Sequence, residues 1–110
     1  MEIRDVAVVG LGTMGAGIAE VFARAGIGVV AIEADPQALR SGLGTLDASL
    51  SRAVSRGRLA ATQQAEIRAR VRPAAAFADA AGVDLAIEVV PERMEIKRQE
   101  IGRASCRERV

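Results

Sequence analysis

Short apolar runs and a segment of helical periodicity alternate along the first third of the chain. Residues 6–9 are one apolar run, and Gly28–Ile32 are a second that is rich in valine and isoleucine. Between them, apolar residues recur at the spacing of one helix face: Ile18, Val21, Phe22 and Ala25. Apolar runs this short are typical of strands buried in a parallel sheet, and Gly26 follows the helical segment as a C-cap would. The pattern predicts a strand–turn–helix–strand unit of about 30 residues.

A longer helical segment follows. Asp35 is a typical N-cap and Pro36 a typical first helical residue. After them comes an apolar stripe at helical spacing: Leu39, Leu43, Leu46, Leu50 and Val54. Gly57 ends this helix, and a second helix is expected over residues 62–70 with Thr62 as its N-cap. Together the two helices predict a hairpin that is longer than a simple crossover between strands requires.

The remaining pattern completes the fold prediction. Residues 71–74 are a weaker strand candidate, residues 75–81 a short helix, and residues 84–90 another buried strand. Pro91 is expected to begin a last helix, from Glu92 onward. The order predicts an α/β fold, a partial Rossmann doubly wound parallel sheet with an inserted helical hairpin and strand order 3-2-1-4. The fourth strand would then present an unpaired apolar edge.

Composition narrows the function classes. The 110 residues include two Phe and no Trp, Tyr or His, so an aliphatic core is expected and the commonest general base is missing. A net charge of +1 argues against a nucleic-acid partner, and no apolar run approaches the ~20 residues of a membrane helix. The single Cys106 cannot form an internal disulfide. With no signal-peptide pattern, we expect one cytoplasmic domain without a metal site.

Residues 10–15 read G-L-G-T-M-G and match the G-x-G-x-x-G turn between a strand and a helix. Gly10 permits the tight turn, Gly12 leaves room for a pyrophosphate, and Gly15 lets the helix lie close to the strand. The free N–H groups at the start of that helix favour a phosphate. Glu33 ends the second strand about 20 residues later, where a carboxylate accepts hydrogen bonds from ribose hydroxyls and repels the 2′-phosphate of NADP. The turn therefore predicts a dinucleotide site that prefers NAD. The alternatives are a tight turn that binds no ligand and, for Glu33, a solvated loop carboxylate.

Four segments share the pattern of one enzyme family. They are V-A-V-V-G-L-G-T-M-G-A-G-I-A-E-V-F-A-R-A-G at 6–26, V-V-A-I-E at 29–33, S-L-S-R-A-V-S-R-G-R-L at 49–59 and D-L-A-I-E-V-V-P-E-R-M-E-I-K at 84–97. In these segments, and as far as Gln99, the chain resembles the 3-hydroxyacyl-CoA dehydrogenases, in particular the bacterial 3-hydroxybutyryl-CoA dehydrogenases. The most specific part is the E-x-x-P-E-x-x-x-x-K pattern.

The resemblance implies a role for each matching residue. The turn residues would bind the cofactor together with Glu33: Gly10, Leu11, Gly12, Thr13, Met14 and Gly15. Glu92 and Lys97 match positions that line the nicotinamide end of the cofactor site. Ser49 and Arg56 match positions on the helical hairpin that contact coenzyme A. Arg56 stands where the family often has Lys, and either side chain can pair with phosphate. The alternatives are an exposed helix face for Ser49 and Arg56, and helix capping for Glu92 with an ion pair to Glu100 for Lys97.

The implied reaction is hydride transfer between NAD and C3 of a 3-hydroxyacyl-CoA, giving the 3-ketoacyl-CoA, in fatty acid and short-chain acyl-CoA metabolism. In the family a His, oriented by a Glu and helped by Ser and Asn, removes the hydroxyl proton, and all four lie beyond the matched segment. We therefore expect no catalytic residue in this chain and no dehydrogenase activity. Because the fourth strand would be an unpaired edge and the family's second domain is absent from the matched segment, we also expect at best marginal stability. The resemblance also implies a full-length homodimeric parent that acts on 3-hydroxyacyl-CoA or acetoacetyl-CoA.

The end of the chain departs abruptly from the family pattern. Residues 101–110 read I-G-R-A-S-C-R-E-R-V, which the codons ATC GGA AGA GCG TCG TGT AGG GAA AGA GTG of a common library adapter encode. The two adapter bases before these codons are AG, which fits the end of a GAG codon for Glu100. We expect residues 1–99 to be an incomplete NAD-binding domain and residues 100–110 to be a non-native tail from adapter read-through.

Two other functions remain open from the residues. One is a dehydrogenase of the 6-phosphogluconate or 3-hydroxyisobutyrate type, whose turn also reads G-L-G-x-M-G. Those enzymes often read NADP with a basic residue where this chain has Glu33, and they lack the hairpin that reaches coenzyme A. The other is a non-enzymatic NAD-sensing module.

Overall fold

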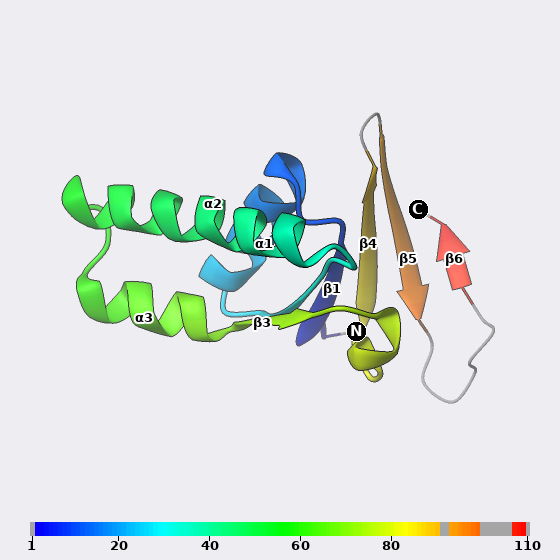
Figure 1. Cartoon of the computed structure of the whole chain (residues 1–110). Helices are drawn as coiled ribbons and strands as arrows, with labels where there is room; N and C mark the ends of the chain where they lie inside the picture. Colours follow the sequence, from blue (N-terminus) through cyan, green and yellow to red (C-terminus); the bar gives the residue numbers. More distant parts are fainter. Residues whose placement is uncertain (1, 91–92, 100–106, 110) are drawn as a thin grey trace.

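The computed structural model describes residues 2–90, 93–99 and 107–109, with side chains for residues 2–89 and Ile96. Figure 1 shows a sheet flanked by helices, with a helical hairpin extending away from it. The elements in chain order are β1 (Asp5–Val9), α1 (Thr13–Arg24), β2 (Gly28–Ile32), α2 (Pro36–Ser55), α3 (Ala61–Ala69), β3 (Val71–Ala74), the short 3-10 helix η1 (Phe77–Ala80), β4 (Leu85–Val90), β5 (Arg93–Gln99) and β6 (Arg107–Arg109). Within these ranges, no helix combines the length and the apolar character that crossing a membrane requires.

The sheet has the predicted topology at its centre. Its strand order is β3-β2-β1-β4-β5-β6, and the first four strands are parallel. Val8 in β1 pairs with Ala31 in β2 on one side and with Ile87 in β4 on the other. The predicted α/β class, the partial Rossmann fold and the 3-2-1-4 order are therefore confirmed.

Aliphatic side chains form a core on each face of the sheet, as the composition predicts. On the face covered by α1 and α2, the fully buried residues with the largest side chains are Val6, Val8, Leu11, Val29, Leu46 and Leu50. On the opposite face, Ala7, Val30 and Ile32 are buried against Ala80 and Val83, next to the half-buried Phe77 of η1. No polar or charged residue among those described is buried. The leucine stripe of α2 thus faces the core, as predicted.

The buried face of α1 differs from the prediction. Val21 is 67% exposed and Ala25 is exposed, whereas Ile18 and Phe22 are partly buried. The residues that face the sheet are smaller: Gly15, Ala16, Ala19 and Ala23. Small side chains let the helix axis lie closer to the sheet. Close packing of this kind, rather than burial of the larger apolar residues, therefore decides which face of α1 is buried.

The hairpin of α2 and α3 begins with a confirmed cap. Asp35 Oδ1 accepts a hydrogen bond of 3.1 Å from the backbone N–H of Gln37. The predicted cap of α3 is wrong, because this helix begins at Ala61 and Ala60 is its N-cap residue. Gln63 Oε1 accepts a hydrogen bond of 2.8 Å from the N–H of Ala60. The Gln63 side chain therefore provides a hydrogen-bond acceptor at the start of α3, where the N-cap residue Ala60 has no hydroxyl.

Polar contacts tie α3 to its neighbours. Arg68 Nε lies 2.7 Å from Asp47 Oδ1 in α2, and its guanidinium also donates to the Val71 carbonyl at 3.2 Å. Gln64 Nε2 donates to Ser51 Oγ at 3.1 Å. These partly exposed contacts each contribute little stability, and they join α3 to α2 and to the start of β3.

The segment after β4 is a strand, so the predicted last helix is wrong. β5 pairs antiparallel with β4, for example Ile87 with Ile96, and β6 pairs antiparallel with β5. The edge of β4, predicted to be unpaired, is therefore covered. An exposed apolar strand edge presents unpaired N–H and C=O groups, and a second strand satisfies them where a helix would not. The sequence M-E-I-K at residues 94–97 alternates apolar and charged residues, which is typical of a strand.

Candidate functional site

A cleft of about 390 Å³ opens at the carboxyl ends of the parallel strands. It is lined by Gly10, Gly12, Thr13, Met14, Gly15, Glu33 and Val89. These residues come from the turn after β1, the first turn of α1, the end of β2 and the end of β4. β2 and β4 flank β1 on opposite sides, so the cleft lies where the direction of the strand order reverses. Ligands of open α/β sheets bind at this type of position.

Two glycines allow the turn and α1 to approach the strands. Gly10 has a φ of +95°, and a Cβ there would lie 2.5 Å from the carbonyl oxygen of Val89 in β4. A Cβ on Gly15 would collide with the carbonyl oxygen of Gly10. The first turn of α1 therefore lies directly on the end of β1, and any side chain at Gly15 would push the two apart.

Gly12 differs from these two because a Cβ there would meet no protein atom within 4 Å. Its φ of −77° is open to any residue. Its missing side chain is therefore not explained by packing within the described residues. The absence of a Cβ instead leaves room at the mouth of the cleft, where Gly12 is exposed.

The N-terminus of α1 faces this room without a cap. Gly12 offers no side-chain acceptor, and the first turn of α1 contains no acidic residue. In α2 and α3, by contrast, Asp35 and Gln63 accept hydrogen bonds from backbone N–H groups at the helix start. The first N–H groups of a helix have no intrahelical partner, and the helix dipole makes that end positive. The start of α1 is therefore suited to an anion.

Glu33 is the acidic residue that lines the cleft, and the backbone holds it in place. Its Oε1 accepts a hydrogen bond of 3.2 Å from the N–H of Leu11, and its Oε2 accepts one of 3.3 Å from the N–H of Asp35. Each carboxylate oxygen has a second lone pair, so the fixed carboxylate can still accept hydrogen bonds from a ligand hydroxyl.

The predicted turn residues do not all face the cleft. Gly10, Gly12, Thr13, Met14 and Gly15 line it, and Met14 is 53% exposed. Leu11 is instead 2% exposed, its side chain belongs to the core, and its N–H is engaged by Glu33. Leu11 therefore does not present its side chain to the cleft.

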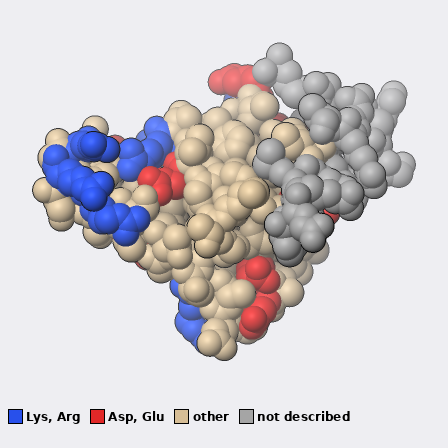
Figure 2. Space-filling view, turned by 90° about the horizontal axis from the view of Figure 1, so that it is seen from above, with Lys and Arg blue, Asp and Glu red and all other residues tan. Residues whose placement is uncertain are grey.

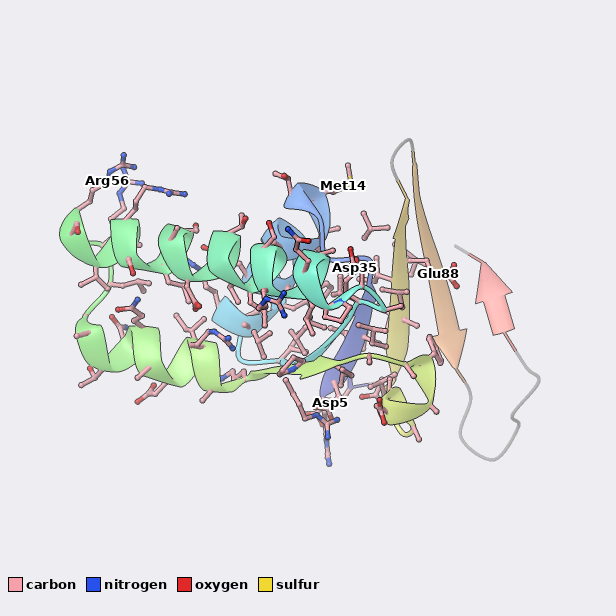
Figure 3. All side chains as sticks on the ribbon, viewed as in Figure 1. Asp5, Met14, Asp35, Arg56 and Glu88 are labelled. Atoms are coloured by element: carbon pink, nitrogen blue, oxygen red, sulfur yellow. The ribbon has the colours of Figure 1, made fainter. Side chains whose placement is uncertain are left out.

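The predicted substrate residues lie on the hairpin. Ser49 is half-buried on α2, and Arg56 is exposed at the C-cap of this helix. Figure 3 shows Arg56 at the tip of the hairpin, with Met14 and Asp35 near the cleft end of the sheet. A helix of 20 residues is about 30 Å long, so Arg56 is remote from the cleft. Figure 2 shows basic side chains gathered at this end, where Arg52 and Arg58 are also exposed.

The two residues predicted at the nicotinamide end are not placed by the structure. Glu92 lies outside the described residues. Lys97 is part of β5, where its backbone pairs with Ala86, and its side chain is outside the described part. Among the described residues, no group of three or more His, Cys, Asp or Glu could hold a metal ion.

Sequence reasoning missed two residues of the site. Val89 lines the cleft from β4. It lies next to Gly10 because β4 pairs with β1 in parallel, with Glu88 opposite Val9. Gly42 lies in α2, buried against Leu11. Its position three residues after Leu39 places it within the predicted apolar stripe, and a glycine there was a usable signal of close packing.

The sequence matches the model of one protein family, described as 3-hydroxyacyl-CoA dehydrogenase, NAD binding domain, over residues 5–106. Among curated proteins, it is 38% identical over 98 residues to 3-hydroxyadipyl-CoA dehydrogenase of Escherichia coli, covering 89% of this chain and 21% of that one. It is 37% identical over 97 residues to 3-hydroxybutyryl-CoA dehydrogenase of Bradyrhizobium diazoefficiens, covering 88% and 33%. The chain thus spans a third or less of the length of these relatives.

The fold is similar to solved structures as well. A crystal structure of (S)-3-hydroxybutyryl-CoA dehydrogenase from Ralstonia eutropha superposes with a TM-score of 0.79 at 34% identity, covering 84% of this chain and 32% of that one. A crystal structure of a 3-hydroxybutyryl-CoA dehydrogenase from Escherichia coli superposes with a TM-score of 0.79 at 38% identity, covering 84% of this chain and 20% of that one.

The geometry predicts different outcomes for alanine at two glycines of the turn. Gly15→Ala should lower the free energy of unfolding by about 1–3 kcal/mol, because its Cβ collides with the Gly10 carbonyl. Gly12→Ala should change it by less than about 0.5 kcal/mol. Urea denaturation followed by far-ultraviolet circular dichroism measures both values. Equal losses for the two variants would contradict the close packing of α1 on β1.

Proposed function

The chain belongs to the 3-hydroxyacyl-CoA dehydrogenase family as its NAD-binding domain, and on this premise we propose that its cleft holds NAD for interconversion of 3-hydroxyacyl-CoA and 3-ketoacyl-CoA in the parent enzyme. The observation that supports this most directly is the uncapped start of α1 over a cleft with a backbone-held Glu33 in its wall. NAD, when bound, accepts the hydride from C3 of the hydroxyacyl group.

The residues of the cleft fit a dinucleotide. The pyrophosphate is proposed to lie over Gly12, at the N–H groups of Thr13 and Met14, where the missing Cβ leaves room and the helix dipole favours negative charge. Glu33 is proposed to accept hydrogen bonds from the ribose hydroxyls of the adenosine half. A carboxylate fixed in this position also repels a 2′-phosphate, which supports NAD over NADP.

The remaining binding roles are proposals drawn from the matched positions. Glu92 and Lys97 are proposed to contact the nicotinamide half of the cofactor. Ser49 and Arg56 are proposed to contact coenzyme A, and the exposed arginines at the hairpin tip support this because phosphates need cationic partners. The family match favours the hydroxyacyl-CoA dehydrogenases over the 6-phosphogluconate type and over a sensing module. A homodimeric parent and a cytoplasmic location stay predictions.

Titration calorimetry of the 110-residue chain with NAD and with NADP tests the cofactor proposal. The chain should bind NAD more tightly than NADP. Glu33→Gln should weaken NAD binding by about tenfold, because a neutral amide is a weaker acceptor than a carboxylate, and should narrow the preference over NADP. Glu66→Ala, an exposed position on α3, is the control and should leave both affinities unchanged. A chain that binds NADP as tightly as NAD would refute the role of Glu33.

The chain by itself is proposed to be inactive. Its sequence contains no histidine, and in its family the proton is removed by a histidine beyond the matched segment. An assay that follows NADH oxidation with acetoacetyl-CoA should give no turnover at a chain concentration at which calorimetry detects NAD binding. Turnover above the rate without protein would show that residues present here suffice for catalysis.

Residues 100–110 are proposed to be non-native. The match between this segment and a translated library adapter supports the proposal, although the family match extends to residue 106. Resequencing the source gene from independent genomic DNA should show a different reading frame after Gln99. A native frame that encodes residues 100–110 unchanged would overturn it.

A further inference from the structure

Leu11 connects three parts of the cleft region. Its N–H donates to Glu33 Oε1 at 3.2 Å, and its side chain is buried in the core beneath the turn. Its carbonyl oxygen and side chain lie against Gly42 of α2. Leu11 therefore transmits the position of α2 to the carboxylate in the cleft wall.

Gly42 is the point at which α2 meets the turn. A Cβ on Gly42 would lie 2.6 Å from Leu11 Cγ and 2.9 Å from Leu11 Cδ2, and closer still to the Leu11 carbonyl oxygen. Real Cβ atoms do not approach other heavy atoms this closely, so the turn or the helix would have to move. Glycine in a helix interior is less stable than alanine, and here close packing explains why glycine is present.

A second glycine of α2 shows the contrast. Gly44 lies two residues along the same helix and is exposed, and a Cβ there would meet no atom within 4 Å. The two positions share a helix and a residue type but differ in contact with the turn. Gly44 is therefore a matched control for Gly42.

The contacts form a closed circuit. Gly42 lies against Leu11, the N–H of Leu11 donates to Oε1 of Glu33, and Oε2 of Glu33 accepts from the N–H of Asp35. Asp35 is the N-cap residue of α2, the helix that contains Gly42. A shift of α2 away from Leu11 would therefore disturb the hydrogen bonds to both carboxylate oxygens of Glu33.

We propose that Gly42 is a positioning residue for the cofactor: the missing side chain lets α2 hold Leu11 where its N–H fixes the Glu33 carboxylate in the cleft wall. This inference rests on the proposed NAD site and deepens it. Gly42 touches no ligand in this scheme and acts only through Leu11. Its effect is directed at the ribose end, because the affected hydrogen bonds are those of Glu33.

Cofactor affinity gives the first test. Gly42→Ala should raise the dissociation constant of the 110-residue chain for NAD by about tenfold, and should raise that for NADP less, so that the NAD preference falls. Gly44→Ala should leave both constants unchanged. A general loss of stability would weaken NAD and NADP binding equally, so an unchanged ratio in Gly42→Ala would overturn the positioning role.

A double-mutant cycle in unfolding gives a second test that needs no cofactor. Glu33→Ala should change the unfolding equilibrium constant by a larger factor in the otherwise unmodified chain than in the Gly42→Ala chain. The two factors should differ by at least about threefold. The same cycle with Gly44→Ala should show no coupling. Additive effects of Gly42→Ala and Glu33→Ala would overturn the inference whether or not NAD binds. Absence of NAD binding by the unmodified chain would instead refute the proposed function.

A second variant covers the case in which Gly42→Ala does not fold. The pair Leu11→Ala with Gly42→Ala removes the clash with the Leu11 side chain and leaves only that with its carbonyl. If this pair folds, it replaces Gly42→Ala in both measurements, with Leu11→Ala alone as its reference. Full NAD preference in the pair, relative to Leu11→Ala, would count against the inference.

Discussion

The first turn of α1 lies on the end of β1 at a separation that only glycine permits. Gly15 leaves no space for a Cβ next to the Gly10 carbonyl, and Gly10 leaves none next to Val89. Because of these contacts, the helix starts directly over the carboxyl end of the central strand β1, and its uncapped first turn lines the cleft. The same closeness selects small residues for the buried face of α1, such as Ala19 and Ala23, and leaves Val21 exposed. One steric constraint thus sets both the core and the proposed anion site.

The polar part of the site depends on a weaker but more directional set of contacts. Glu33 lies in the cleft wall, and the N–H groups of Leu11 and Asp35 both donate to its carboxylate. Backbone donors cannot rotate away as side chains can, so the charge stays where a ribose would meet it. Hydrogen bonds to a fixed acceptor discriminate between ligands better than burial of apolar surface does. These contacts are why we propose that Glu33 and its backbone donors select the cofactor, while the start of α1 binds its phosphates.

Most local signals were read correctly from the sequence, but the N-cap of α3 and the segment after β4 were not, and neither was the packing of α1. The Gly-rich turn, the Asp35 cap and the strand of residues 84–90 are encoded by neighbouring residues, and the structure has the predicted elements there. The burial of α1 depends on how close the sheet lies, which no periodicity reveals. The role proposed for Gly42 depends on Leu11, 31 positions away in the sequence. A glycine within the apolar stripe signals close packing, but only the folded chain shows its partner.

The helix α2 links the two ends of the proposed function. Its N-terminus is capped by Asp35 beside Glu33, its first half contacts the turn through Gly42, and Arg56 stands at its far end. The ion pair of Arg68 with Asp47 braces the second half against α3. A helix of 20 residues is about 30 Å long, so the contact at Gly42 and the ion pair at Asp47 both bear on where its far end lies. The packing that we propose holds the carboxylate for the cofactor therefore also orients the helix whose far end carries Arg56, the residue proposed to contact coenzyme A.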